Sequence, residues 1–309
     1  MADEHAFFDL QVNGYMGVDF NADALLPAHL SKACEQLRAD GVNGILATII
    51  TDDVDRMAAR VRNLVRARSE VPLAQELIRG IHLEGPFINE APGYVGAHPA
   101  HAVKPASVAA VEPLINAGDG WVRLVTLAPE QDSGSRTTRW LVDRGICVSA
   151  GHCDPTLDEL RAAIDNGLSM FTHLGNGCPL MLHRHDNIVQ RVLSLADRLW
   201  VCFIVDGVHV PFSVLRNYIK CVGVERTIVV SDAIGAAGLG PGEFTLGKMK
   251  VVVDEHLATW AADRSHLMGS AMTMPQAYEN LRSHVGLSQA DARRLTNANP
   301  RAALGLAAC

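Results

Sequence analysis

Eight short apolar runs recur along the chain, and the stretches between them mostly place apolar residues at helical spacing. The runs cover residues 7–12, 44–50, 79–83, 122–127, 146–150, 168–172, 199–205 and 226–230. Strands that alternate with helices predict parallel βα units. Eight such units in about 250 residues predict an α/β fold of the TIM-like (β/α)8 barrel type. A doubly wound open sheet is the alternative.

The remaining segments fit one domain over residues 1–309. Residues 244–267 alternate enough to predict a β-hairpin insertion, and 274–284 and 288–297 read as closing helices. Asp154, followed by Pro155, is the expected cap of the helix after the fifth strand. The sequence contains no linker, no repeat beyond the βα period and no low-complexity tract.

Three strands are expected to end on residues that bind metals. Glu84 ends the third apolar run just before Gly85-Pro86, and His152 and His173 follow the fifth and sixth runs. Any one of them alone reads more simply as a turn or core residue. In a barrel, however, these strand ends converge on one mouth. One carboxylate and two imidazoles suit zinc or a similar divalent ion with a position left open for water.

Other polar residues also lie at or just beyond predicted strand ends: Gln11, Asn13, Asp206, His209 and Asp232. Asp232 could take a proton from an activated water and hand it to a leaving amine. The alternative role for Asp232 is a helix cap.

Composition narrows the classes of protein. The 309 residues carry a formal charge of −7, with 48% hydrophobic and 20% charged residues, which is typical of a soluble globular protein. The absence of a basic run disfavours nucleic-acid binding. The acidic N-terminus does not fit a secretory signal, and no apolar stretch reaches membrane-spanning length. Seven cysteines without a Cys-x-x-Cys pair indicate reduced thiols and a cytoplasmic protein, with Cys153 a neighbour of His152 and not a ligand.

Together these motifs resemble the N-acetylglucosamine-6-phosphate deacetylases of the amidohydrolase superfamily, from Asp9 to Gly305. The resemblance implies that Glu84, His152 and His173 hold one divalent metal and that Asp232 is the catalytic acid/base. Zinc is the expected metal, with iron, manganese or cobalt as alternatives. Superfamily members often carry His-x-His on the first strand, where this chain has the weaker amide ligands Gln11 and Asn13. The motifs that carry the resemblance are His82-Leu83-Glu84-Gly85-Pro86, Ser149-Ala150-Gly151-His152, Thr172-His173-Leu174, Asp206-Gly207-Val208-His209-Val210 and Ser231-Asp232-Ala233.

The resemblance also suggests substrate contacts. His98 and His209 match family histidines that touch the sugar or the amide, although either could be a structural histidine. The family's phosphate cradle is altered here to residues 175–179, of which Asn176 and Gly177 remain candidates. Arg184 matches a phosphate-binding arginine, since a guanidinium suits phosphate. The alternative is a helix-start cluster capped by Asp186.

Family members usually add a small β-sandwich, for which we see no sequence outside the predicted barrel. The leading hypothesis is a metal-dependent deacetylase of an N-acetyl-hexosamine 6-phosphate, and two rival hypotheses remain. One rival is an amidohydrolase for another N-acyl sugar, an N-acyl amino acid or a cyclic amide. The other is a non-catalytic barrel that binds metal or sugar. The family further suggests a homodimer with a small-molecule substrate and no membrane partner.

Overall fold

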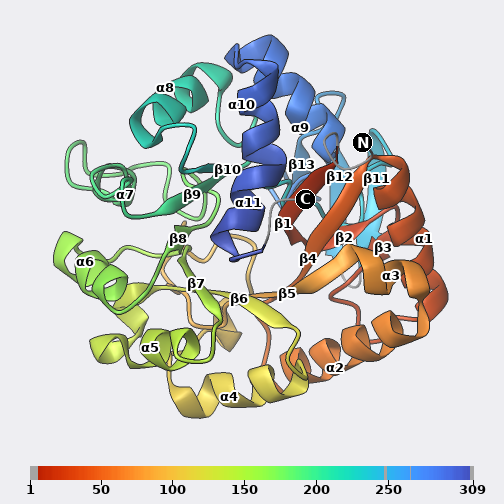
Figure 1. Cartoon of the computed structure of the whole chain (residues 1–309), viewed down its shortest axis with the longest axis horizontal. Coiled ribbons are helices and arrows are strands. Elements are labelled where there is room, and N and C mark those ends of the chain that lie inside the picture. Colours follow the sequence, from red (N-terminus) through yellow and green to blue (C-terminus); the bar gives the residue numbers. More distant parts are fainter. Residues whose placement is uncertain (1–5, 247–248, 265, 307–309) are drawn as a thin grey trace.

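Eight parallel strands form the centre of the protein. The computed structural model describes residues 6–246, 249–264 and 266–306. The sheet order is that of the chain, β1-β4-β5-β6-β7-β8-β9-β10 (Figure 1). A parallel bridge from Val12 to Ala233 joins the two edges. The predicted barrel is therefore confirmed, and the doubly wound alternative is wrong because its strand order would reverse. The strands are β1 (Phe7–Val12), β4 (Val42–Ile50), β5 (Ile78–Glu84), β6 (Val122–Leu127), β7 (Cys147–Ala150), β8 (Met170–Phe171), β9 (Trp200–Phe203) and β10 (Thr227–Val229).

Helices surround the barrel on the outside (Figure 1). Each buries an apolar stripe, as α1 does with Leu30, Ala33 and Leu37. Short π-helical turns at Leu281–Val285 and Arg294–Ala298 continue α9 and α10. The helices are α1 (Pro27–Ala39), α2 (Val54–Glu70), α3 (Pro72–Leu77), α4 (Val108–Ala117), α5 (Arg136–Val142), α6 (Leu157–Asp165), α7 (Ile188–Leu193), α8 (Phe212–Val222), α9 (Met274–Asn280), α10 (Gln289–Arg293) and α11 (Asn299–Ala303).

One predicted cap was misplaced. Helix α6 is capped by Thr156, whose hydroxyl accepts from the backbone N–H of Glu159, while the Glu159 carboxylate accepts from the Thr156 backbone N–H. This capping box satisfies two otherwise unpaired donors at once, which a cap by Asp154 two residues earlier would not. Asp154 instead binds Arg191 over 2.7 Å.

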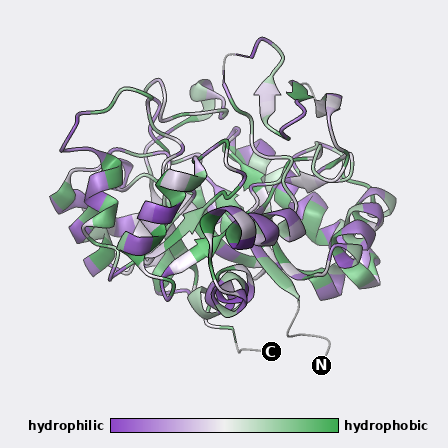
Figure 2. Ribbon diagram, turned by 90° about the horizontal axis from the view of Figure 1, so that it is seen from above, coloured by the Kyte–Doolittle hydropathy of each residue, from purple (hydrophilic) through white to green (hydrophobic). Residues whose placement is uncertain are grey.

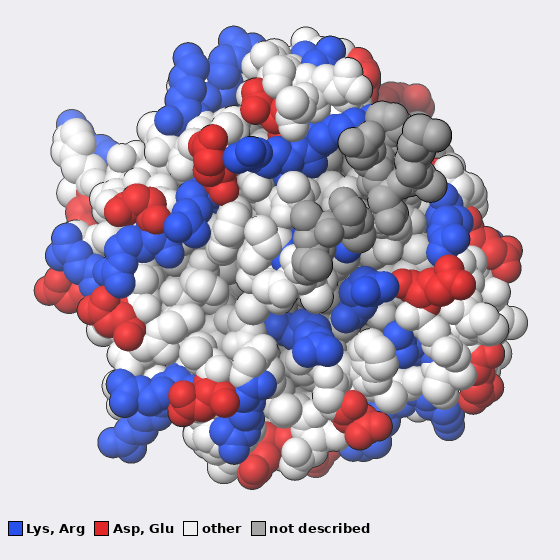
Figure 3. All heavy atoms as spheres, in the orientation of Figure 1, with Lys and Arg blue, Asp and Glu red and all other residues white. Residues whose placement is uncertain are grey.

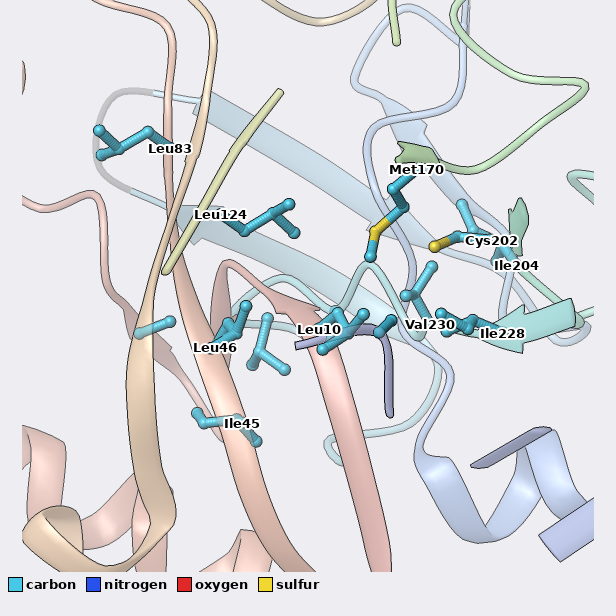
Figure 4. Close-up of a cluster of buried hydrophobic side chains, with 14 of the residues drawn as sticks. Leu10, Ile45, Leu46, Leu83, Leu124, Met170, Cys202, Ile204, Ile228 and Val230 are labelled. Carbon is cyan, nitrogen blue, oxygen red and sulfur yellow. The ribbon is translucent and has the colours of Figure 1, made fainter. Parts of the chain in front are cut away.

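The barrel interior is filled by side chains and is not a pore. Leu10, Leu46, Leu124 and Met170 from four strands, with Val230 directly after β10, meet in one cluster (Figure 4). Figure 2 also shows that the central strands are mostly hydrophobic, whereas the surrounding helices carry both hydrophobic and hydrophilic residues. Because the interior is packed, ligands cannot pass through the barrel and bind instead at the mouth formed by the C-terminal ends of the strands.

Two small sheets are added at the mouth. The hairpin β2 (Gly14–Tyr15) and β3 (Val18–Asp19) follows the first strand. Strands β11 (Gly242–Leu246), β12 (Met249–Val253) and β13 (Thr259–Ala261) form an antiparallel sheet in the region where the sequence suggests a hairpin insertion. This inserted sheet lies at the end of the molecule opposite to both termini (Figure 2).

The outer surface carries mixed charge on the face shown in Figure 3, where Lys and Arg are interspersed with Asp and Glu. Within the described residues, no helix has the length and apolarity needed to cross a bilayer. The six cysteines that lie in the described part of the chain are free thiols.

Candidate active site

The structure brings the four principal predicted residues into one cavity of about 690 Å³. Glu84 is the last residue of β5, and His152 and His173 lie two residues beyond β7 and β8. Asp232 lies three residues beyond β10. His98 and His209 line the same cavity.

Three of these residues have an unusual backbone. The φ angles of His152, His173 and Asp232 are 52°, 28° and 50°, in the left-handed region that L-residues rarely adopt. At each of these three residues the backbone therefore turns sharply just after the strand, and the side chain lies at the mouth of the barrel. Backbone strain of this kind persists where the surrounding structure enforces it, and it concentrates at functional sites.

Glu84 is the centre of an imidazole cluster. Nε2 of His173 lies 2.9 Å, and Nε2 of His152 3.5 Å, from the same oxygen, Oε1. Nε2 of His98 lies 3.8 Å from the other oxygen, Oε2. One donor atom from each of Glu84, His98 and His152 lies within 4.8 Å of the other two. The cluster thus includes the three predicted metal ligands and also His98, which the resemblance assigned to the substrate.

The protonation states in this cluster suit a metal ion. Burial would raise the pKa of Glu84, but its hydrogen bonds to His152 and His173 hold that pKa well below its ordinary value. Burial lowers the pKa of His98 to about 3, so its imidazole is neutral. Burial would lower the pKa of His173, but its hydrogen bond to Glu84 and the charge of that carboxylate raise it overall, so a divalent cation bound there would take the place of a proton. The donor set fits such an ion.

Neighbouring groups fix the ring orientations. Nδ1 of His152 lies 2.7 Å from the carbonyl oxygen of Tyr94, and Nδ1 of His98 lies 2.7 Å from Oγ1 of Thr51. These contacts direct Nε2 of both rings toward Glu84. The His152 ring also packs against Gly177, where an added Cβ would come within 2.8 Å of Nδ1.

The two first-strand amides connect the carboxylates. Gln11 donates from Nε2 to Glu84 Oε1 over 2.9 Å and to Asp232 Oδ1 over 3.0 Å. Its Oε1 accepts from Thr172 Oγ1 over 2.6 Å. Asn13 donates from Nδ2 to Asp232 Oδ1 over 2.8 Å. Burial, reinforced by the charge of Glu84, raises the pKa of Asp232 to about 6, close to the range that suits proton transfer near neutrality.

His209 is held by a second carboxylate. Its Nδ1 lies 2.6 Å from Oδ2 of Asp206, whose Oδ1 accepts from the backbone N–H groups of Val208 and His209. Burial would raise the pKa of Asp206, but these hydrogen bonds and the charge interaction with His209 lower it. The Asp206 carboxylate therefore orients the His209 ring, which lines the cavity.

The loop after β8 is only partly at the cavity. Asn176 and Gly177 line it, whereas Arg184 is exposed and is not among the lining residues. Within the described part of the chain, the cavity lining contains no Lys or Arg. Asp186 does not cap the next helix, because Asn187 accepts from Gln190 N–H there and Asp186 binds Arg191 over 2.7 Å.

Sequence reasoning missed one wall of the cavity. This wall comes from the inserted sheet and the loop after it. It contains Trp260, His266 and Met268, which belong to none of the predicted site motifs. The Trp260 indole N–H donates to Asp254 Oδ2 over 2.9 Å, which fixes the ring. The alternation of residues 244–267 predicted strands, but residues of an insertion have no place in the βα period, so nothing in their spacing indicated that they line the cavity.

The chain is similar over most of its length to known deacetylases of amino sugar phosphates. N-acetylgalactosamine-6-phosphate deacetylase of Escherichia coli O157:H7 is 30% identical, with 97% of this chain and 78% of that protein covered. Human N-acetylglucosamine-6-phosphate deacetylase is 32% identical, with 97% and 74% covered. No family model matches the chain.

Solved structures give the same result. A mutant N-acetyl-D-glucosamine-6-phosphate deacetylase from Mycobacterium smegmatis, in complex with N-acetyl-D-glucosamine-6-phosphate, superposes with a TM-score of 0.87 at 31% identity and covers 97% of this chain and 77% of that one. The enzyme from Thermotoga maritima has a TM-score of 0.84 at 30% identity, with 97% and 78% covered.

Proposed function

Since the chain belongs to the N-acetylglucosamine-6-phosphate deacetylase family, we propose that it hydrolyses the acetamide of an N-acetyl-hexosamine 6-phosphate. The products are acetate and the amino sugar phosphate. The observation that carries the proposal is the placement of Asp232 beside the cluster of Glu84, His152 and His173 in one cavity.

One divalent metal belongs to the proposed site. Glu84, His152 and His173 would hold it, because both imidazole Nε2 atoms converge on the same carboxylate oxygen. When bound, such an ion lowers the pKa of water toward neutrality and polarises a carbonyl. Zinc is the proposed metal, with iron, manganese or cobalt as alternatives.

Asp232 moves the proton in this reaction. Its carboxylate takes a proton from the attacking water as the water oxygen bonds to the carbonyl carbon. It then gives that proton to the nitrogen as the C–N bond breaks, and the electron pair of that bond goes to the nitrogen. Gln11 holds the Asp232 and Glu84 carboxylates in position relative to each other, because its side-chain NH2 group donates to both. His209, held by Asp206, is placed to bind a sugar hydroxyl or the developing oxyanion.

The phosphate end of the substrate is proposed to bind the loop after β8. The backbone N–H groups of Gly175 and Gly177, where φ is 94° and 59°, are the proposed donors to the phosphate; the N–H of Asn176 between them donates to the His173 carbonyl over 3.0 Å. Arg184 lies further along this loop and is the proposed cation. Arg184→Ala should raise KM for a phosphorylated substrate about tenfold or more and leave an unphosphorylated one unaffected. Equal KM changes for both would remove Arg184 from the site.

A second candidate function keeps the hydrolase and changes the substrate. The absence of Lys and Arg from the described cavity lining favours an uncharged substrate such as a neutral N-acyl sugar or a cyclic amide. It does not favour an N-acyl amino acid, which carries a carboxylate. Acetate release from phosphorylated and unphosphorylated N-acetyl sugars separates the two. Release from neither sugar, and no hydrolysis of N-acyl amino acids or cyclic amides, at a full metal content, would support a non-catalytic metal- or sugar-binding barrel.

The central test is Asp232→Asn. The variant should release no acetate yet retain the metal, because the side chain is not among the proposed ligands. Metal content measured by plasma mass spectrometry is the control. A variant with full turnover would disprove the proposed role of Asp232.

Two further properties are proposed. The free cysteines suit a reducing compartment, so we place the protein in the cytoplasm. Leu180 and Met181 are almost fully exposed at the loop tip, at 104% and 89%, which suits a homodimer contact. Light scattering after gel filtration measures the assembly, and fractionation of cells measures the compartment.

A further inference from the structure

The side chain of Asn13 holds a buried acceptor without a donor. Its Nδ2 donates to Asp232 Oδ1 over 2.8 Å, whereas its Oδ1 has no hydrogen-bond partner among the described residues. Asn13 is only 7% exposed and lines the cavity. Buried polar atoms are nearly always paired in native proteins, so this acceptor points to a donor supplied by a ligand.

The orientation of the Asn13 amide is fixed by its surroundings. An ionised Asp232 only accepts hydrogen bonds, so the NH2 group must face it and Oδ1 must face away. The backbone is anchored too, because the Asn13 N–H donates to the Ala233 carbonyl over 2.7 Å and its carbonyl accepts from Phe20 N–H over 2.9 Å. Asn13 therefore cannot turn its amide to satisfy Oδ1 internally.

Gln11 provides a contrast two residues away on the same strand. The side-chain amide of Gln11 makes its hydrogen bonds within the protein: Oε1 accepts from Thr172, and Nε2 donates to Glu84 and Asp232. Gln11 thus positions other groups, while Asn13 has an acceptor to spare. Both contact the same oxygen of Asp232.

We propose that Asn13 is a substrate-contacting residue whose Oδ1 accepts the hydrogen bond from the N–H of the scissile secondary amide. The inference rests on the proposed function. Asp232 must reach the leaving nitrogen to protonate it, so that nitrogen comes close to the carboxylate oxygen to which Asn13 is bound.

This contact would orient the nitrogen for its departure. When water adds to the carbonyl carbon, the nitrogen regains a lone pair beside its single N–H. With that N–H held by Asn13 Oδ1, the lone pair turns toward Asp232. The proton that Asp232 took from water then moves to the nitrogen, the C–N bond breaks, and the free amine leaves.

The contact also predicts selectivity between an amide and an ester. An ester has an oxygen in place of the N–H, and its lone pairs would face the lone pairs of Asn13 Oδ1. Removing the Asn13 side chain should therefore harm amide hydrolysis more than ester hydrolysis, since the loss of its bond to Asp232 is common to both.

The experiment measures kcat/KM for N-acetylglucosamine 6-phosphate and for 2-O-acetylglucose 6-phosphate, its oxygen counterpart. Asn13→Ala should lower the amide value about tenfold more than the ester value, because the lost Nδ2 bond to Asp232 affects both substrates, whereas only the amide loses the Oδ1 contact. Gln11→Ala is the matched control and should lower both values by the same factor, because it disturbs the carboxylates and not the N–H contact. Equal losses on both substrates in Asn13→Ala would overturn the proposal.

A binding measurement makes the test independent of turnover. On metal-free protein, calorimetry should show the amide compound binding several-fold more weakly to Asn13→Ala than to the wild type, with the ester unchanged. Equal affinities of variant and wild type for the amide would also overturn the contact. Asn13→Ser, which is too short to reach, replaces Asn13→Ala if the latter fails to fold by circular dichroism. If the wild type releases no acetate from the amide, the proposed function fails, and the binding arm still decides the contact.

Discussion

Asp9 should make the protein less stable as the pH rises from 4 to 7. This buried carboxyl lies on β1 and accepts hydrogen bonds from the backbone N–H groups of Gln11 and Ser231. Burial raises its pKa from 3.8 to about 7; the hydrogen bonds from Ser231 and Gln11 oppose the shift, and the charge of Asp232 adds to it. Between these two values the folded protein keeps a proton on Asp9 that the unfolded chain has lost.

The sign and size follow from proton linkage. Where the folded state binds one more proton, the free energy of unfolding falls by about 1.4 kcal/mol per pH unit. From 3.8 to about 7 the fall reaches about 4 kcal/mol, and above pH 7 it stops. Asp9→Asn keeps an acceptor for the two N–H groups and cannot ionise. The variant should lack this fall.

The assay is thermal unfolding of wild type and Asp9→Asn, followed by circular dichroism from pH 4 to pH 8. At about 2 °C per kcal/mol for a chain of this size, the Tm of the wild type relative to the variant should drop by about 8 °C across the window. Effects of other titrating groups, including loss of metal in acid, largely cancel in this difference. A difference that stays constant with pH would refute the reasoning.

Three further predictions concern the site. Glu84→Gln should lose the divalent metal on gel filtration, because the donor set loses its negative charge; wild-type metal content by plasma mass spectrometry would contradict this. Gly177→Ala should lower kcat/KM at least about tenfold, because its Cβ would lie 2.8 Å from Nδ1 of His152, and unchanged kinetics would show that the ring position is not critical. Because burial, followed by the charge of Glu84, raises the pKa of Asp232 to about 6, kcat/KM should fall about tenfold per pH unit below pH 6; a rate that stays flat down to pH 5 would argue against Asp232 as the proton acceptor.

The positions of the strand ends could be predicted because two local signals coincide there. An apolar run that stops at a polar residue marks both the end of a buried strand and a side chain at the mouth. Glu84, His152 and His173 satisfied both conditions, and the structure gathers them around one carboxylate oxygen. Even β8, which has only the two residues Met170–Phe171, ends one residue before the end of the predicted run 168–172.

Loops gave weaker signals, because their course depends on tertiary contacts. His98 is buried in the cluster because its ring contacts Thr51 and Glu84. The spacing of residues in its own segment does not indicate this position. A motif match assigned Arg184 to phosphate, and the structure places it at an exposed position outside the cavity lining, so its contact with phosphate stays a prediction. Trp260 belongs to an inserted sheet outside the βα pattern. Local periodicity therefore predicts which residues lie at the strand ends, whereas contacts between loops decide which loop residues line the cavity.

The seam of the barrel explains why the proton chemistry lies where it does. Between β1 and the segment after β10, a single bridge from Val12 to Ala233 replaces a regular ladder. Side chains supply the missing connections, since Asp9 accepts from Ser231 N–H, and Gln11 and Asn13 donate to Asp232. A full ladder would have kept residue 232 in an extended conformation, with its side chain alternating with those of its neighbours. Because the ladder ends early, Asp232 can adopt φ of 50° and face the carboxylate of Glu84 across the mouth. The same hydrogen bonds that close the barrel therefore also position its proposed acid/base.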